Sequence, residues 1–336
     1  MVQIEYPFVS VIIPTRNRRD LLKATIESLY KQSYPKDRYE IIIIDNASDD
    51  ETDKMILSIQ PHAPRALNYI SKNDDGPGVA RNLGLSKAIG SIVAFIEDDC
   101  IADPQWLERG VSRMIDGVGL VQGTTLPNPH QTRKTFSRTQ EIIRENKLYQ
   151  TCNMFYRKED LDLVGGFSPE FIGRDFFGKT MMSGEDADLA WKVKKLGWKS
   201  VFAEDAVVYH HVFSLRPGKL IISYRKCQLF FYTWPNLLQK HPEMRKDLLY
   251  LQLFREKQNA LFFLFLISII VGTFFHWSFF FLMFPYAVNL VTWSFNRRSL
   301  RTYPRGFIVF IIYILKDLVN FILLLCGSIW YRSLVL

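Results

Sequence analysis

The chain has 336 residues, enough for one large domain or two moderate ones, and its hydrophobic content of 48% supports a full core. The net charge of +8 is concentrated at one end, because residues 259–336 hold six Lys or Arg residues against a single acid. Positive charge beside long apolar runs favours an anionic lipid surface as partner, and it argues against nucleic acid and against a merely soluble basic protein.

The four cysteines show no pattern of a disulfide framework or a zinc site. Cys100, Cys152, Cys227 and Cys326 form no CxxC pair, so they indicate a reducing compartment and isolated buried thiols. The N-terminal residues contain no basic region followed by a long apolar one, so we predict no cleaved signal peptide. We therefore expect the first 250 residues to stay on the cytosolic side.

Apolar strands alternate with helices from the N-terminus to residue 110. Strands are predicted over "FVSVIIP", stopped by Pro14, over "YEIIIID", ending at Asp45, and over "ALNYIS" and "SIVAFI". Helices are predicted over "RRDLLKATIESLYKQSYP", "ETDKMILSIQ" and "GPGVARNLGLSKAIG", the last with Gly90 as its stop. This alternation predicts an α/β fold with a parallel sheet covered on both faces, and ligands outside the carboxyl ends of the strands.

The pattern is looser after residue 110. We expect a strand over "VGLVQGTTLP", a helix over "SRTQEIIRENKLYQ", and a strand followed by a short helix over "TCNMFYRKEDLDLVGGF". A further helix is predicted to start at Ser183 and to stop at Gly197, and "SVFAEDAVVYHHV" then returns to a strand.

The C-terminal quarter has the composition of membrane helices. Residues 259–295 contain no Lys, Arg, Asp or Glu, and one span needs about 20 residues, so this run can hold two short helices that turn at "FFHWSF". The arginines of "NRRSLRTYPRG" place the next loop in the cytosol. A third apolar stretch, Phe307–Trp330, contains Lys316 and Asp317. It either spans the bilayer with these charges facing other helices or lies at the interface.

These shifts in composition predict three domains. Residues 1–215 form the α/β domain, residues 216–258 form amphipathic juxtamembrane helices, and residues 259–336 form a membrane domain of two to three helices, crossing as a hairpin or several times. Two alternatives stay open. Residues 216–258 could be ordinary packed surface helices, and the apolar tail could be a buried hairpin of a soluble protein.

Three consecutive carboxylates, Glu97, Asp98 and Asp99, directly follow the apolar strand "SIVAFI". Adjacent carboxylates disfavour one another's charge unless a cation neutralises them, and hard oxygen ligands suit Mg²⁺ or Mn²⁺. Such a metal usually keeps open positions that phosphate oxygens can fill. The sequence therefore predicts a metal–diphosphate site here, with a solvated acidic turn as the alternative.

Other polar residues end strands or open a helix of the same predicted domain. Asp45 ends a second strand, where it could accept hydrogen bonds from a base or a sugar hydroxyl. Glu185 and Asp186 open a helix whose dipole favours an ionised carboxylate, as a general base requires. His210 and His211 end a later strand and point to opposite faces, so one of them is a candidate metal ligand or phosphate contact. Taken singly, each position also has an ordinary structural explanation.

Six segments in this order resemble the family-2 glycosyltransferases: "VSVIIPTRNR", "IIIIDNASDD", "GPGVARNLGL", "FIEDDCIADPQWLE", "TCNMFYRKEDLDLVGGF" and "GEDADLAWKVKKLGWK". The resemblance covers roughly residues 8–212. It implies a GT-A fold, a Rossmann-like nucleotide-sugar-binding domain with a mostly parallel central sheet. It also implies an inverting transfer from a nucleotide-diphosphate sugar, with UDP as the expected nucleotide, that depends on Mn²⁺ or Mg²⁺.

The resemblance assigns roles by position. Asp186, with Glu185 beside it, matches the catalytic base, and Asp99 and Asp98 match the metal ligands. His210 or His211 is similar to a downstream metal or phosphate histidine. The positions expected at the nucleotide sugar are Pro14, Thr15, Arg16, Asp45, Arg81, Asp98 and Asn153.

Two positions depart from the family pattern. Glu97 stands where Asp is usual, which leaves the role of this carboxylate open, and the family's Gly-Asn element reads Cys152–Asn153. No QxxRW-like motif follows residue 186, so the sequence argues for transfer of a single sugar and against processive synthesis.

Membrane helices beside a cytosolic active site predict a lipid-linked glycan or glycolipid as acceptor, at the cell membrane, in the synthesis of envelope polysaccharide. The alternatives are a synthase that transfers sugar to polyprenyl phosphate, and a catalytically inactive scaffold with a GT-A-like shell. The retained Asp98, Asp99 and Asp186 argue against the scaffold, and the lack of a GxxxxGK[ST] loop argues against an NTPase. The sequence leaves the donor sugar, the acceptor and the oligomeric state open.

Overall fold

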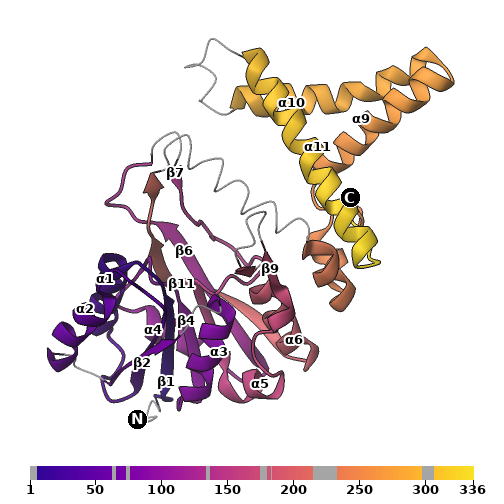
Figure 1. The fold of residues 1–336 in the computed structure, drawn as a ribbon. Coiled ribbons are helices and arrows are strands. Elements are labelled where there is room, and N and C mark those ends of the chain that lie inside the picture. The colour runs from indigo at the N-terminus through magenta and orange to yellow at the C-terminus, as the bar shows by residue number, and fades with distance from the viewer. Residues whose placement is uncertain are drawn as a thin grey trace. The chain divides into compact units, whose positions relative to one another are not determined.

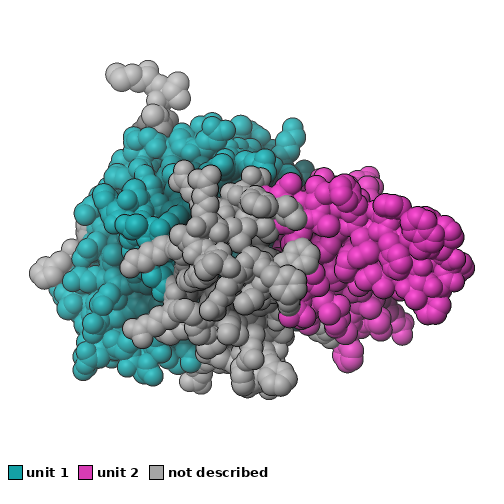
Figure 2. All heavy atoms as spheres, turned by 90° about the horizontal axis from the view of Figure 1, so that it is seen from above, with its two compact units in different colours: residues 1–222 teal, residues 223–336 magenta. Residues whose placement is uncertain are grey.

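The computed structural model describes residues 6–62, 66–72, 76–133, 137–174, 180–182, 184–214, 233–296 and 306–336. The chain divides into two compact units, residues 1–222 and 223–336, which are coloured separately in Figure 2. The predicted boundary between residues 215 and 216 lies outside the described residues, so the three-domain division stays a prediction.

An eight-stranded sheet forms the centre of the first unit, in the order β3-β2-β1-β4-β8-β6-β11-β5. Six strands are parallel, and β8 and β5 run against their neighbours. The mostly parallel sheet predicted from the sequence is therefore confirmed. The strands are β1 (Val9–Thr15), β2 (Tyr39–Asn46), β3 (Leu67–Lys72), β4 (Ile92–Ile96), β5 (Cys100–Ala102), β6 (Val118–Pro127), β8 (Asn153–Arg157) and β11 (Lys199–His210).

The strand order reverses between β1 and β4. The chain runs outward from β1 through β2 to β3, and then returns to place β4 on the other side of β1. In open α/β sheets such a reversal opens a crevice at the carboxyl ends of the strands, where ligands bind. The carboxyl ends of β1 and β4 are Thr15 and Ile96, so the crevice lies where the acidic triplet begins.

Helices cover both faces of the sheet (Figure 1). Leu22 and Ile26 of α1 pack with Val11 and Ile41 in a core that also includes side chains of α2 and α4. On the opposite face, α3 approaches so closely that a Cβ at Gly84 would lie 2.6 Å from Cγ2 of Ile12. The helices of this unit are α1 (Arg19–Tyr30), α2 (Thr52–Ile59), α3 (Pro77–Lys87), α4 (Trp106–Ser112), α5 (Lys158–Leu163) and α6 (Glu185–Lys195), with short 3-10 turns η1 (Gln60–His62) and η2 (Pro169–Phe171).

Pro14 does not stop the first strand, which continues to Thr15. Pro14 is in register with Ile44 of β2, whereas the pairing of β1 with β4 ends at Ile12. The strand therefore has a single neighbour at Pro14, and such positions tolerate a residue without an N–H.

The helix predicted over residues 137–150 is wrong. Ser137–Arg138 instead form β7, which pairs with β12 (Phe213–Ser214), and Ile142 exchanges two backbone hydrogen bonds with Thr125 of β6, at 2.7 and 2.9 Å. Pairing with distant strands thus satisfies backbone groups that a helix would have satisfied locally.

Gly90 was expected to end α3, but that helix ends at Lys87. Gly90 lies against the backbone of the first strand, where a Cβ would stand 2.6 Å from the carbonyl oxygen of Phe8 and 2.6 Å from the nitrogen of Ser10. The predicted stop of α6 is confirmed, because Gly197 follows the helix with φ +96°. The predicted start of α6 at Ser183 lies outside the described residues. Two short strands, β9 (Ile172–Arg174) and β10 (Thr180–Met182), precede it.

The second unit is helical. After a helical stretch at residues 233–240, its elements are α8 (Met244–Leu248), α9 (Lys257–Phe274), η3 (Trp277–Met283), α10 (Phe284–Asn296) and α11 (Gly306–Trp330). The chain turns at the predicted "FFHWSF" segment, and Phe262 of α9 packs against Tyr286 and Leu290 of α10. Among the described residues, α9 alone is long and apolar enough to cross a membrane, with a mean hydropathy of 1.6.

Helix α11 turns apolar side chains outward and polar ones inward. Asp317 is buried, and its Oδ2 accepts hydrogen bonds from Gln258 of α9 at 2.7 Å and Tyr286 of α10 at 2.9 Å. Exposed apolar side chains recur along the opposite face at helical spacing: Leu315, Leu318, Val319, Ile322, Leu325, Ile329 and Trp330. This is the reverse of a helix that covers the core of a soluble protein. Cys326 of this helix is exposed as well, so the prediction of a buried thiol is wrong for this cysteine.

Candidate functional site

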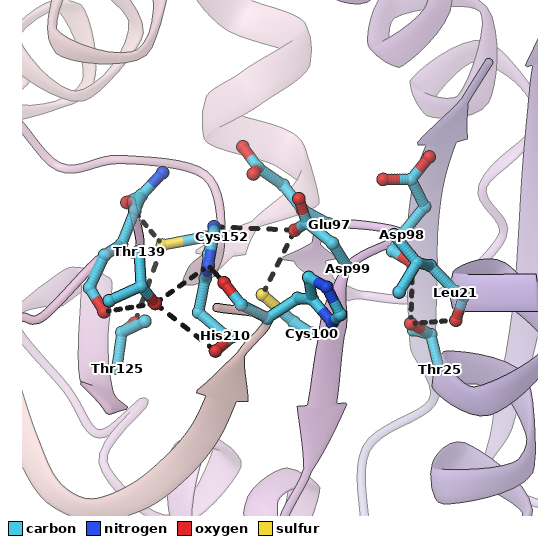
Figure 3. Close-up of polar contacts among 12 residues, drawn as sticks. Leu21, Thr25, Glu97, Asp98, Asp99, Cys100, Thr125, Thr139, Cys152 and His210 are labelled. Atoms are coloured by element: carbon cyan, nitrogen blue, oxygen red, sulfur yellow. Dashed lines mark hydrogen bonds and ion pairs between the residues drawn. The ribbon is translucent and has the colours of Figure 1, made fainter. Parts of the chain in front are cut away.

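The predicted acids meet the end of β1 at the carboxyl edge of the sheet. Thr15 donates a hydrogen bond from Oγ1 to Oδ2 of Asp98 at 2.8 Å, across the point where the strand order reverses. Thr25 of α1 donates to the backbone carbonyl of Asp98 at 3.0 Å, which holds the acidic loop against the helix (Figure 3). Both carboxylates, Asp98 and Asp99, are buried.

Arg18 bridges these two carboxylates. Its Nη1 donates to Oδ1 of Asp98 at 2.8 Å and to Oδ2 of Asp99 at 2.7 Å, and its guanidinium lies 5.5 Å from the ring centroid of Phe213. Sequence reasoning missed Arg18. It named Arg16, which is exposed like Arg18, and the contact of Arg16 with the nucleotide sugar stays a prediction. Several arginines follow β1 in "TRNRR", and only the position where α1 starts decides which one reaches the acids.

The acidic triplet is electrostatically crowded, as its sequence predicted. Burial raises the pKa of Glu97 to about 8, the charge of Asp99 adds to this, and Arg81 opposes it. Burial also raises the pKa of Asp98 to about 6, although Arg18 opposes the rise. A divalent cation at this place would relieve the repulsion.

Asp99, Cys100 and His210 form a group of possible metal ligands (Figure 3). Oδ1 of Asp99 lies 3.5 Å from Nε2 of His210 and 3.8 Å from Sγ of Cys100. Nδ1 of His210 is 2.8 Å from the carbonyl oxygen of His211, which leaves Nε2 to face Asp99. The ring of His211 instead contacts Gln131, with 2.8 Å between Nδ1 and Nε2, so His210 is the histidine at the acids.

The chemistry of this group fits a divalent metal. A carboxylate oxygen and an imidazole nitrogen suit Mn²⁺, while the neighbouring thiol is a softer ligand. Asp98 is outside this group, and Thr15 and Arg18 bond its two carboxylate oxygens. Asp99 and His210 are therefore the candidates in this group that would hold the metal, and the role of Asp98 as a ligand stays a prediction.

Arg81 connects the acidic triplet to the acids of α6. Its Nη2 lies 3.5 Å from Glu97, and its Nη1 lies 3.7 Å from both Glu185 and Asp186. Burial alone would lower the pKa of Arg81, but these carboxylates, Asp186 foremost, hold it above its usual value. The side chain is buried, with only 5% exposed, yet its Nε and Nη1 have no hydrogen-bond partner among the described residues. Such buried donors are rare in proteins, so they point to an anionic ligand.

Asp186 lies in the first turn of α6 and is oriented by one residue. Thr151 donates to its two carboxylate oxygens, from the backbone N at 3.2 Å and from Oγ1 at 3.1 Å. The side chain remains 20% exposed, so an acceptor could still reach it. Beside it, burial and the charge of Asp186 raise the pKa of Glu185 to about 7.

Asn153 has its polar groups occupied inside the core. Its Oδ1 accepts from the indole of Trp106 at 2.8 Å, and its Nδ2 donates to the carbonyls of Thr124 and Ala206, both at 2.9 Å. Its side chain therefore joins β8 to its neighbours, and we leave it out of the site proposed below.

Asp45 lies buried at the end of β2, as predicted, next to Thr15 in the strand register. Its Oδ2 accepts a 2.5 Å hydrogen bond from the hydroxyl of Tyr69, and its Oδ1 accepts from the backbone N of Ser48 at 2.9 Å. A base that binds Asp45 would thus replace Tyr69. Pro14 is half-buried beside Thr15 and can offer only its backbone carbonyl.

Comparison with known proteins gives three findings. The model of the family "Glycosyl transferase family 2" matches residues 10–171. The chain is 31% identical over 213 residues to "Glycosyltransferase AglE" of Haloferax volcanii, which covers 61% of this chain and 67% of that protein. It is 38% identical over 94 residues to the "GalNAc(5)-diNAcBac-PP-undecaprenol beta-1,3-glucosyltransferase" of Campylobacter jejuni, which covers 28% of this chain and 30% of that protein.

A solved structure shares the fold. The chain superposes on mannosyltransferase PcManGT from Pyrobaculum calidifontis, solved with GDP-Man and Mn²⁺, with a TM-score of 0.62 and 17% identity, over 98% of this chain and 89% of that one.

Proposed function

Since the chain belongs to glycosyltransferase family 2 and has the GT-A fold, we propose that it transfers a single sugar, with inversion, from a nucleotide-diphosphate sugar to a hydroxyl acceptor. The observation that carries this proposal is the position of Arg81. This one buried cation lies within 3.7 Å of Glu97, Glu185 and Asp186, and so joins the candidate diphosphate site to the candidate base.

We propose that the donor binds along the carboxyl edge of the sheet. Asp45 would receive the base at the end of β2. Nε and Nη1 of Arg81, which have no hydrogen-bond partner among the described residues, would donate to the diphosphate. Asp99 and His210 would hold Mn²⁺ or Mg²⁺, which when bound neutralises the charge that develops on the leaving diphosphate. UDP is the nucleotide expected from the resemblance, and GDP is tested beside it because PcManGT was solved with GDP-Man.

Asp186 is the proposed general base. Its hydrogen bonds from Thr151 fix the carboxylate, and its place in the first turn of α6 favours the charged form through the helix dipole. From there it would accept the proton of the acceptor hydroxyl as that oxygen attacks the anomeric carbon. Attack opposite the leaving diphosphate inverts the configuration of the sugar.

The second unit supports a membrane location for the reaction. The 18 residues of α9 extend about 27 Å, close to the thickness of a bilayer core. The outward apolar face of α11 and its inward Asp317 are the arrangement expected of a helix that faces lipid. We propose a lipid-linked acceptor at the cytosolic face of the membrane, and the name of the Campylobacter relative, which includes a PP-undecaprenol substrate, supports the same class.

Sugar transfer and the role of Asp186 can be tested together. The full chain in lipid nanodiscs would be incubated with Mn²⁺ and a panel of UDP-, GDP- and dTDP-sugars, first without and then with undecaprenyl-diphosphate glycans. Release of nucleoside diphosphate that depends on the acceptor is expected, and Asp186→Asn should lower kcat by a factor of about 10² to 10⁴ while donor binding persists.

Asp188→Asn is the matched control, because Asp188 lies in the same helix but bonds Ser168 and Lys192 away from Arg81. A wild-type chain that binds no donor of the panel would overturn the proposal. Transfer to polyprenyl phosphate alone would show a sugar-phosphate synthase instead, and an Asp186→Asn variant with full kcat would remove this residue as the base.

A further inference from the structure

Arg18 occupies the position of a counter-cation between the two acids of the metal motif. The same nitrogen, Nη1, contacts Asp98 at 2.8 Å and Asp99 at 2.7 Å. Both carboxylates are almost fully buried, with side chains 6% and 3% exposed, so without this guanidinium two adjacent charges would face each other in a region of little water.

The oxygens of Asp99 show what this contact excludes. Oδ1 faces His210 and Cys100, and Oδ2 is bonded to Arg18. A divalent metal held by Asp99 would lie within a few ångströms of the guanidinium, and two cations at that distance repel each other strongly. The contact between Arg18 and Asp99 and a metal on Asp99 therefore compete for the same carboxylate.

The backbone of Arg18 is fixed, whereas its side chain has room to move. Arg18 precedes α1, and its carbonyl accepts the first hydrogen bond of that helix, from Leu22 at 2.9 Å. Its side chain is 40% exposed and borders a cavity of about 570 Å³, which is also lined by Asn17, Asp50 and Phe213. The guanidinium can thus leave Asp99 by rotation of its own side chain, without a change in the fold.

We propose that Arg18 exchanges partners in each catalytic cycle: it neutralises Asp98 and Asp99 before the donor binds, and it turns to the diphosphate of the donor when the metal takes Asp99. This rests on the proposed function and assigns Arg18 a substrate-binding role there. Charge balance supports the exchange. When Arg18 leaves the carboxylate of Asp99, the diphosphate becomes its new anionic partner, and a guanidinium pairs well with phosphate oxygens.

The exchange makes two opposite predictions for one variant. In Arg18→Met, which keeps the length of the side chain without its charge, Mn²⁺ alone should bind about tenfold tighter, since its competitor is gone. UDP or GDP in the presence of saturating Mn²⁺ should bind about tenfold weaker, since a phosphate partner is gone. Electron paramagnetic resonance titration of free Mn²⁺ and calorimetry with each nucleotide measure the two affinities on the full chain.

Two further variants sharpen the test. Arg19→Met removes the neighbouring arginine, which pairs with the exposed Asp20 and Glu51, and should change neither affinity more than twofold. Arg18→Lys keeps the charge and should return the Mn²⁺ affinity toward the wild-type value. Unchanged melting temperatures would show that all three variants are folded.

The outcomes separate this inference from the proposed function. A wild-type chain that binds Mn²⁺ and a nucleotide, with Arg18→Met equal to wild type or weaker for Mn²⁺ alone, would overturn the exchange and leave the proposed function standing. Tighter Mn²⁺ binding with unchanged nucleotide affinity would overturn the contact with the diphosphate. A wild-type chain that binds neither ligand would overturn the proposed function and the exchange with it.

Discussion

His210 ends β11 and His211 follows it, but their rings have different surroundings. Nε2 of His210 lies 3.5 Å from Asp99, and the ring of His211 contacts Gln131. Successive side chains of an extended chain point to opposite faces, which separates the two rings. The pair therefore allows the proposed metal ligand to be compared with a neighbouring histidine.

We expect His210→Gln to weaken Mn²⁺ binding by about tenfold or more, because it removes one of the two proposed ligands. His211→Gln should change Mn²⁺ affinity less than threefold. Titration of both variants with Mn²⁺ in the presence of UDP or GDP measures the difference. Equal losses in the two variants would show that the histidines do not act as the structure places them.

At the scale of single residues, sequence patterns located the acids at the ends of strands and helices, but they did not show which arginine contacts them. The acids Asp45, Asp98, Asp99 and Asp186 lie at strand or helix ends, as their positions in apolar runs indicated. Arg18 could not be found in this way, because its contact with Asp98 spans 80 positions and depends on where α1 begins. The contacts of Asn153 could not be predicted either, because the sequence alone does not distinguish an Asn that bonds inside the core from one that contacts a ligand.

At the scale of elements, close approach of two backbones explains Gly90 better than helix capping. Any side chain there meets main-chain atoms at Phe8 and Ser10, and main-chain atoms inside a sheet cannot move aside as a side-chain end can. The segment between α3 and β4 is thereby held directly against β1, so the position of the acidic triplet depends on it.

Gly90→Ala should therefore lower the melting temperature of the first unit by about 5 °C, which corresponds to roughly 1 to 3 kcal/mol of overpacking. Ser91→Ala, at the adjacent exposed position, should leave it unchanged within a degree. Scanning fluorimetry of the full chain provides the measurement. A Gly90→Ala variant as stable as wild type would mean that the two segments can separate at little cost.

The strands were predictable because a buried parallel strand is a continuous apolar run, as in "EIIIID" and "SIVAFI". The structure of residues 137–150 was not predictable, because Ile142 pairs with Thr125 and β7 pairs with β12. A local sequence pattern does not indicate a pairing partner so far along the chain. Local propensity yields to such tertiary contacts.

At the scale of the whole molecule, the two units present different surfaces. In the first unit Trp106 and Trp191 are buried, at 0% and 4% exposure, whereas Trp277 and Trp330 of the second unit are 65% and 73% exposed. Large exposed aromatic side chains on apolar helices are expected where a protein contacts lipid, and they support the proposed membrane location.

Brominated lipids provide a test, because bromine quenches only the tryptophans that it can approach. We expect brominated phosphatidylcholine nanodiscs to quench the fluorescence of the full chain, and Trp277→Phe with Trp330→Phe to remove at least half of that quenching. Trp191→Phe in α6 is the control and should leave the quenched intensity unchanged, since its side chain is buried. Quenching that persists fully in the double variant would contradict a lipid-facing second unit.

The hydrogen bond between Thr15 and Asp98 also bears on how the site comes into existence. It joins residues 83 positions apart, with three strands and three α-helices between them. Contacts of such long range form late in folding, because the intervening chain must first lose its freedom. During synthesis the N-terminal segment can therefore fold around β1 to β3 before Asp98 is in place, and the donor site is then incomplete. Nucleotide affinity should then arise only when β4 takes its place beside β1, which makes it a marker of the completed sheet.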